Sequence, residues 1–145
     1  MKKHVIYDFI FKNHHKKRTC AIYILTAFYR MQILLVPSKY LEPKWGVRGE
    51  ESPEKETEEH YRTAYFISQD VNRIANKTTW ESLCLVRALA ARYLRYRKGI
   101  PTTLSLGVGK DENNKMVAHA WLRCGEMYMT GGNGEGYAMV AKFCK

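Results

Sequence analysis

The first strong pattern of apolar positions lies near the front of the chain. Residues Ala21 to Val36 are apolar apart from two polar interruptions, Arg30 and Gln32, and Pro37 then blocks further helix. The run is too short to span a bilayer comfortably, so it predicts a buried or half-buried helix. No small-residue cleavage site follows it, which argues against a signal peptide. The sequence leaves open whether this helix also lies on a membrane surface or on a partner protein.

Two further segments show a helical period in the middle of the chain. Apolar residues recur three and four positions apart from His60 to Ala75, which predicts an amphipathic helix. Thr78 and Glu81 have the spacing of a capping box, in which each side chain satisfies a backbone N–H at a helix start. We therefore expect a second helix from Trp80 to Arg97. The apolar stripe expected on the first of these helices comprises Tyr61, Ala64, Tyr65, Ile67 and Val71.

The period changes from helical to alternating after residue 101. Four short segments alternate apolar and polar residues, and polar or glycine-rich turns separate them. The expected strands are residues 103–108, 116–123, 127–130 and 137–143. Helices followed by an antiparallel meander predict an α+β fold with a small antiparallel sheet.

The segment between the first two helices is polar and is punctuated by proline and glycine. Residues 38–59 therefore predict a loop, whose acidic part leads into a solvated helix start. This divides the chain into a helical amino-terminal region with an acidic linker, residues 1–60, and a core, residues 61–145. We expect one compact domain overall, because 145 residues leave no room for two full cores.

The charge is strongly basic and unevenly distributed. The chain has 24 Lys and Arg against 14 Asp and Glu, which gives a net charge of +10. The surplus lies mostly in residues 1–49 and favours an acidic partner or an anionic surface. The candidate basic clusters are residues 12–18 and 92–98. No ordered nucleic-acid-binding motif is present, so we expect no nucleic acid partner.

The cysteines narrow the class of protein further. The four are Cys20, Cys84, Cys124 and Cys144, and no two of them form a C-x-x-C pair. This spacing disfavours a zinc site, and we expect no metal and no cofactor. Reduced thiols in a cytoplasmic protein are the favoured interpretation, although the sequence alone also allows two disulfides.

One pair of residues is suited to chemistry. Cys84 lies close to a predicted helix start, where the helix dipole favours a thiolate, and Arg87 adds positive charge one turn later. His119 lies on a predicted strand between two alanines, which leave room for a substrate. A Cys near a helix N-terminus facing a His on a later strand is the arrangement of an activated thiol nucleophile. Each residue alone is more often structural, so this pattern by itself is weak.

Four motifs in a fixed order strengthen the interpretation. They are W-x-x-x-C-L at a helix start, a basic-Gly-Ile helix end, a strand closing on Gly-Val, and A-H-A-W on a strand. In this chain they occur within TTWESLCLVRALAARYLRYRKGIPTTLSLGV and AHAWL. The stretches ILLVPSKYLEPKWG and TGGNGEGYAMVAKF add similarity at the two ends. Over most of its length the sequence resembles the transglutaminase-like leader peptidases of lasso peptide biosynthesis.

This resemblance implies a transglutaminase-like, papain-like core with the Cys at a helix N-terminus and the His on a strand. Cys84 would be the nucleophile of a cysteine protease and His119 its general base, and the Cys84 backbone N–H would contribute to the oxyanion hole. The family's third member is an Asp after the His, and no Asp follows His119 here. The expected supporting residues are Trp80 and Arg87. The expected third member is Asn133, with Glu135 or no residue as the alternatives.

The resemblance also implies the partners. The substrate would be a ribosomally made precursor peptide whose leader is removed. Other family members carry a leader-recognition domain in the same chain, and this chain has no room for one, which implies a separate small recognition protein. The ATP-dependent cyclase of the same biosynthesis is a further candidate partner. The alternative to a protease is a non-catalytic scaffold of the same fold, which the missing Asp favours.

Overall fold

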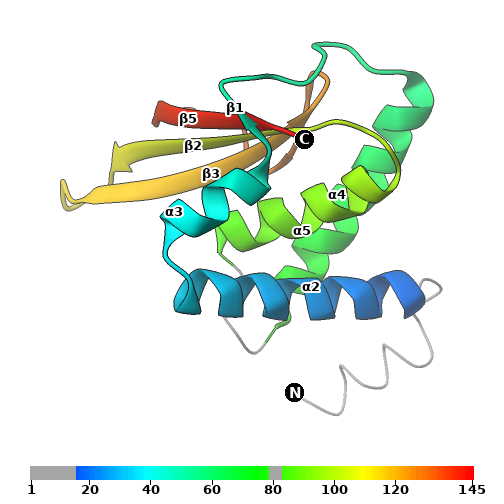
Figure 1. Cartoon of the computed structure of the whole chain (residues 1–145), viewed down its shortest axis with the longest axis horizontal. Helices are drawn as coiled ribbons and strands as arrows, with labels where there is room; N and C mark the ends of the chain where they lie inside the picture. The colour runs from blue at the N-terminus through cyan, green and yellow to red at the C-terminus, as the bar shows by residue number, and fades with distance from the viewer. Residues whose placement is uncertain (1–15, 79–82) are drawn as a thin grey trace.

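The computed structural model describes residues 16–78 and 83–145 of the chain. A five-stranded antiparallel sheet forms one layer of this described part, and the helices lie together on one side of it (Figure 1). The strands are β1 (Val47–Arg48), β2 (Thr103–Lys110), β3 (Met116–Cys124), β4 (Met127–Thr130) and β5 (Ala138–Cys144). The expected α+β fold is confirmed, and the four expected strands are all present with nearly the predicted limits.

The order of the strands corrects the expected meander. The order is β1-β5-β2-β3-β4, so only β2, β3 and β4 follow one another as neighbours. β5 returns to the far side of β2, where Phe143 lies opposite Leu104. The chain between β4 and β5 must therefore cross over β3 and β2, and we call residues 131–137 the crossover segment. Alternation along one strand does not reveal this pairing, because it does not say which strands become neighbours.

Helix α4 (Glu58–Ala75) begins and packs largely as the sequence indicates. The Thr57 hydroxyl accepts a hydrogen bond from the His60 backbone N–H at 3.2 Å, which caps the helix start. Ala64, Ile67 and Val71 form the buried stripe. Tyr65 does not belong to it, because its side chain is 53% exposed. Ser68 is buried in its place, and its hydroxyl donates a hydrogen bond to the Met129 carbonyl at 2.5 Å.

Helix α5 (Cys84–Arg97) packs against β3 of the sheet, and its buried side includes three alanines. Ala88, Ala90 and Ala91 are fully buried. Arg92 and Arg95 are buried as well, so the expectation that residues 92–98 form an exposed basic cluster is wrong for these two residues. Helix geometry explains the error, since Arg92 and Arg95 each lie four positions after a core alanine, Ala88 and Ala91, and so share their face.

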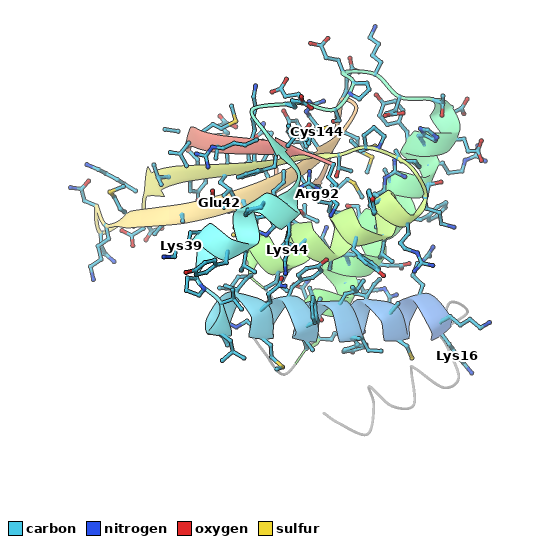
Figure 2. The ribbon with its side chains drawn as sticks, in the orientation of Figure 1. Lys16, Lys39, Glu42, Lys44, Arg92 and Cys144 are labelled. Atoms are coloured by element: carbon cyan, nitrogen blue, oxygen red, sulfur yellow. The ribbon has the colours of Figure 1, made fainter. Side chains whose placement is uncertain are left out.

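Arg92 connects α5 to three other parts of the fold: η1, the segment just before β2, and β5. Its guanidinium donates hydrogen bonds to the backbone carbonyls of Trp45, Thr102 and Phe143. Burial lowers the pKa of Arg92 to about 10, which still leaves it a cation at neutral pH. Figure 2 shows Arg92 between the helices and the sheet, near Cys144 at the end of β5. Arg92 therefore serves the fold rather than a basic surface.

The two faces of the sheet carry different side chains, because successive residues of a strand point to opposite sides. Ala120, Leu122 and Cys124 of β3 are buried in the core that the helices cover. The Cys124 sulfur accepts a hydrogen bond from Arg95 of α5 at 2.9 Å, which identifies this side as the inner face. The residues of β3 that point to the outer face are Val117, His119, Trp121 and Arg123.

Helix α2 (Lys16–Leu35) covers the expected apolar run from Ala21 to Val36 almost completely. Its buried side, formed by Thr19, Ile22 and Thr26, packs on the core, and Arg18 forms an ion pair with Asp70 of α4. The prediction of a half-buried helix is confirmed. In the described ranges, no helix is both long and apolar enough to cross a membrane.

Residues 38–59 contain more structure than the expected loop. They include α3 (Ser38–Leu41), the short helix η1 (Glu42–Trp45) and β1. Leu41 and Trp45 enter the same core as α4 and α5. Ser52 is also buried, and its hydroxyl lies 2.8 Å from the Thr103 hydroxyl of β2. Residues on both sides of position 60 therefore build one core.

Candidate functional site

Cys84 is the first residue of α5. The expected helix start at Trp80 is not where the helix begins: Leu83 is its N-cap, and Leu83 makes no side-chain capping bond. The Thr78 hydroxyl donates a hydrogen bond to the Ala75 carbonyl at 3.1 Å, just after α4, and Glu81, the other residue of the expected capping box, lies outside the described residues. The half-buried Cys84 thiol thus lies within the first turn, where backbone N–H groups lack helical acceptors and favour an anion.

Of the two supporting residues expected around Cys84, the structure describes Arg87. Arg87 lies one turn further along α5 and donates a hydrogen bond to the Asn76 side-chain oxygen at 2.7 Å, at the end of α4. It therefore joins the two helices as well as adding positive charge near the thiol. Trp80, the other expected supporting residue, lies outside the described residues.

His119 is held by the chain that crosses the sheet. Its Nε2 lies 2.6 Å from the carbonyl oxygen of Gly131. Because a carbonyl oxygen only accepts hydrogen bonds, this contact requires the proton on Nε2 and leaves a lone pair on Nδ1 of the neutral ring. The imidazole also stacks on Tyr137, with ring centroids 4.6 Å apart. The Gly131 carbonyl and the Tyr137 ring thus fix the imidazole in place, and Nδ1, the nitrogen that could act as a base, takes no part in the bond to Gly131.

Trp121 forms the base of the same outer-face cluster. Its ring stacks with His119 at a centroid distance of 6.1 Å. A Cβ atom at Gly107 of β2 would lie 2.8 Å from the Trp121 ring, and one at Gly134 would lie 2.5 Å from it. The indole therefore occupies the space between the sheet and the crossover segment, and glycine on both sides gives it that space.

Asn133, the expected third site residue, shares no hydrogen bond with His119. Its side-chain oxygen accepts a hydrogen bond from the Glu135 backbone N–H at 3.0 Å, and both residues are exposed. A local turn of this kind is a common role for Asn. The Gly131 carbonyl and the Tyr137 ring hold the imidazole instead. Every residue has a backbone carbonyl, so the sequence could not indicate that the carbonyl of Gly131 would hold His119. Tyr137 becomes a neighbour of His119 only because of the path of the crossover segment, which the sequence did not predict.

The structure places Cys84 and His119 on different sides of β3. Among the described residues, the Cys84 sulfur and the His119 ring share no hydrogen bond. Cys84 packs against the inner-face core, whereas His119 points to the outer face with Trp121. Each group is in a setting suited to its expected role, but the pair is not assembled as a dyad.

Metal chemistry has no support in the described ranges. No group of three or more His, Cys, Asp or Glu side chains gathers there as metal ligands would. All four cysteines have free thiols.

Comparison with known proteins places this arrangement in a family. Residues 41–142 match the Transglutaminase-like superfamily, which generally comprises cysteine peptidases and transferases. The matched range includes Cys84, His119, all of β1 to β4 and most of β5. No curated protein and no solved structure matches the chain significantly. A match over most of the chain, on a helix-and-sheet fold with Cys at a helix start and His on a strand, shows that the chain belongs to the transglutaminase-like superfamily.

Proposed function

We propose that the protein is a cysteine peptidase that removes the leader from a ribosomally made precursor peptide of the lasso class. The observation that carries the peptidase proposal is the place of Cys84 as the first residue of α5 in a transglutaminase-like chain. The resemblance of the Trp80–Val108 region and of the AHAW strand to lasso leader peptidases supports the substrate class. The precursor peptide and a small separate leader-recognition protein are the proposed partners, with the ATP-dependent cyclase as a further one.

The proposed reaction uses the two residues in turn. His119 Nδ1 takes the proton from the Cys84 thiol, and the thiolate sulfur attacks the scissile carbonyl carbon. Backbone N–H groups at the start of α5, including that of Cys84, stabilise the oxyanion. The imidazolium then protonates the leaving amine as the C–N bond breaks, which leaves a thioester on Cys84. Water activated by His119 hydrolyses the thioester and regenerates the thiol.

The proposal has one geometric requirement. The Cys84 sulfur and the His119 Nδ1 must come within hydrogen-bond reach in the substrate complex, as catalytic hydrogen bonds often do only when substrate is bound. Gly131 bonds Nε2 through a neutral carbonyl, which orients the ring but adds no full negative charge to stabilise an imidazolium. We therefore expect slower turnover than for a relative that has a carboxylate at this place.

The test is cleavage of a precursor peptide in the presence of its leader-recognition protein. We expect Cys84→Ala to abolish cleavage and His119→Gln to reduce it by at least about a hundredfold, the usual contribution of a general base. Cys20→Ala is the matched control, because Cys20 is an exposed thiol on α2, remote in sequence from the site, and it should cleave at the parental rate. Cleavage by Cys84→Ala at the parental rate would exclude the proposal.

A second function is favoured by the separation of the two groups. If Cys84 and His119 remain on different sides of β3 when substrate binds, the protein acts as a scaffold that holds the precursor for another enzyme. The scaffold predicts that Cys84→Ala still binds the precursor and still supports its maturation. Iodoacetamide labelling separates the two functions without a substrate, because a peptidase needs Cys84 to react faster than Cys20 at neutral pH.

A further inference from the structure

Helix α2 carries an apolar stripe on the side that faces solvent. From Cys20 onwards its exposed residues are all apolar or thiol-bearing: they are Cys20, Ile24, Phe28, Met31, Leu34 and Leu35. Three of them, Ile24, Leu34 and Leu35, are 68%, 64% and 73% exposed. Their spacing of three and four positions places them along one side of the helix, over a length of about 22 Å.

The opposite side of α2 already packs on the body of the protein. Thr19, Ile22 and Thr26 are buried there. Figure 1 shows that the other described elements all lie on this side of α2, with the sheet furthest away. A continuous exposed apolar patch on a protein surface commonly marks a site of contact with a partner or a membrane. No other part of the described chain therefore covers the exposed stripe of α2.

The charge around the stripe indicates what covers it. Lys16 and Lys17 are exposed at the start of α2, and Lys39 is exposed just beyond its end (Figure 2). Helix α2 contains no Asp or Glu. The only acid in residues 16–49 is Glu42, and its carboxylate accepts a hydrogen bond from Arg48 at 2.9 Å. The stripe is thus an apolar band with lysines at both ends and no opposing acid along the helix.

An anionic lipid surface has the complementary chemistry. The apolar residues of an interfacial helix enter the boundary between headgroups and acyl chains, while lysines at its ends reach the lipid phosphates. A second copy of the chain fits less well. In an antiparallel pair of α2 helices, Lys16 of one copy would approach Lys39 of the other, and both copies carry a net charge of +10.

We propose that the exposed stripe of α2 docks the protein on an anionic membrane surface, with the helix lying in the plane of the interface. The proposal does not depend on the peptidase activity, because no residue of the stripe belongs to the candidate site. Docking through α2 would hold the sheet and its crossover segment on the side of the molecule away from the lipid, since α2 and the sheet lie at opposite sides of the fold (Figure 1).

The test is flotation of the purified full chain with vesicles of phosphatidylcholine alone and of phosphatidylcholine mixed with phosphatidylglycerol. We expect binding to the mixed vesicles, and weaker binding at high salt because screening reduces the attraction of the lysines. Phe28→Glu should weaken binding by at least about tenfold, because it places a charge in the apolar stripe. Far-ultraviolet circular dichroism and a thermal melt would show that the variant is folded.

Phe66→Glu provides the matched control. Phe66 is 50% exposed on α4, as Phe28 is 54% exposed on α2, and each stacks edge-on against a neighbouring tyrosine. Phe66→Glu should bind vesicles as the parent does. Equal binding to neutral and anionic vesicles, or binding to neither, would overturn the proposal. A dimer in sedimentation analysis that Phe28→Glu converts to monomer, without vesicle binding, would also overturn it and assign the stripe to contact between protein copies.

Discussion

The two faces of β3 show how one strand can serve the fold on one side and the candidate chemistry on the other. On the inner face, Leu122 and Cys124 pack among the helices and are fully buried. On the outer face, His119 is only half-buried; it stacks with Trp121 of the same strand, and its other contacts come from a single glycine-rich segment. The inner face is held by packing from several elements, whereas the outer face depends on the course of residues 131–137.

Because of this difference, substitutions on the two faces should have different effects. A change on the inner face removes apolar contacts that the whole fold shares, so it should act on global stability. A change on the outer face should act on the position of the His119 ring. The following substitutions test that separation, beginning with the one that should cost the most stability.

Leu122→Ala should destabilise the protein by about 3 kcal/mol, because a fully buried leucine leaves a cavity that the surrounding core fills only in part. Met116→Ala on the same strand should change stability by less than about 0.5 kcal/mol, since Met116 is 72% exposed. Urea unfolding measures both. Equal losses in the two variants would mean that the inner face does not carry the stability of this strand.

Gly131→Ala should cost at least about 1 kcal/mol more than Gly132→Ala. Both glycines have a positive φ, 75° and 69°, which alone costs a non-glycine residue about 1 kcal/mol. At Gly131, an added Cβ would also collide with the Ala120 carbonyl oxygen, whereas at Gly132 it would meet nothing within 4 Å. Backbone must move to relieve that collision, as overpacked sites require.

The same pair of variants tests the outer face directly. Nitrogen NMR of the His119 ring should detect the Nε2–H tautomer in the parent and in Gly132→Ala. The Nε2 signal should move in Gly131→Ala, because the carbonyl that accepts its proton is displaced. If the signal is the same in all three proteins, the crossover segment does not hold the imidazole.

Cys124→Ala should have a smaller effect, and one that depends on pH. Burial raises the pKa of the Cys124 thiol above its ordinary value of 9.0, and the nearby Arg95 only partly opposes the shift. Above pH 9.0 the thiol of the unfolded chain ionises first, so the contribution of Cys124 to stability is complete below that pH and is lost as the pH rises.

Unfolding in urea at neutral pH and at a pH above the ordinary thiol value measures this dependence. The variant should lose about 1 kcal/mol at neutral pH, within the range for a small core truncation, and the gap to the parent should narrow in alkali. Cys20→Ala removes an exposed thiol and should show neither effect. A constant gap at both pH values would mean that the Cys124 thiol ionises equally in the two states.

Much of the fold could be predicted from local patterns. The helix over residues 60–75 and the four strands follow from apolar spacing, because burial on one side imposes the period of the element on the sequence. The start of α5 was predicted less well: the capping-box spacing of Thr78 and Glu81 indicated a helix from Trp80, whereas α5 begins at Cys84, after the N-cap residue Leu83, which makes no side-chain capping bond. A short strand such as β1 leaves no period to detect.

The candidate site was predictable in its residue types but not in its assembly. Cys84 near a helix start and His119 on a strand both follow from the pattern around them. The hydrogen-bond partner of His119 could not be predicted, because the acceptor is a backbone carbonyl and every residue has one. Which face His119 occupies depends on strand pairing across the whole sheet, and that pairing is set by contacts distant in sequence.

The position of β5 also has a consequence for the order in which the sheet can form. β1 pairs with β5, through Val47 opposite Cys144, and β5 in turn pairs with β2. The strand nearest the front of the chain therefore has no place in the sheet until the strand furthest along has arrived. Closing so long a loop is entropically costly and slow. We expect β1 and β5 to join the sheet together, as the last step of folding, and to be the first strands released when it opens.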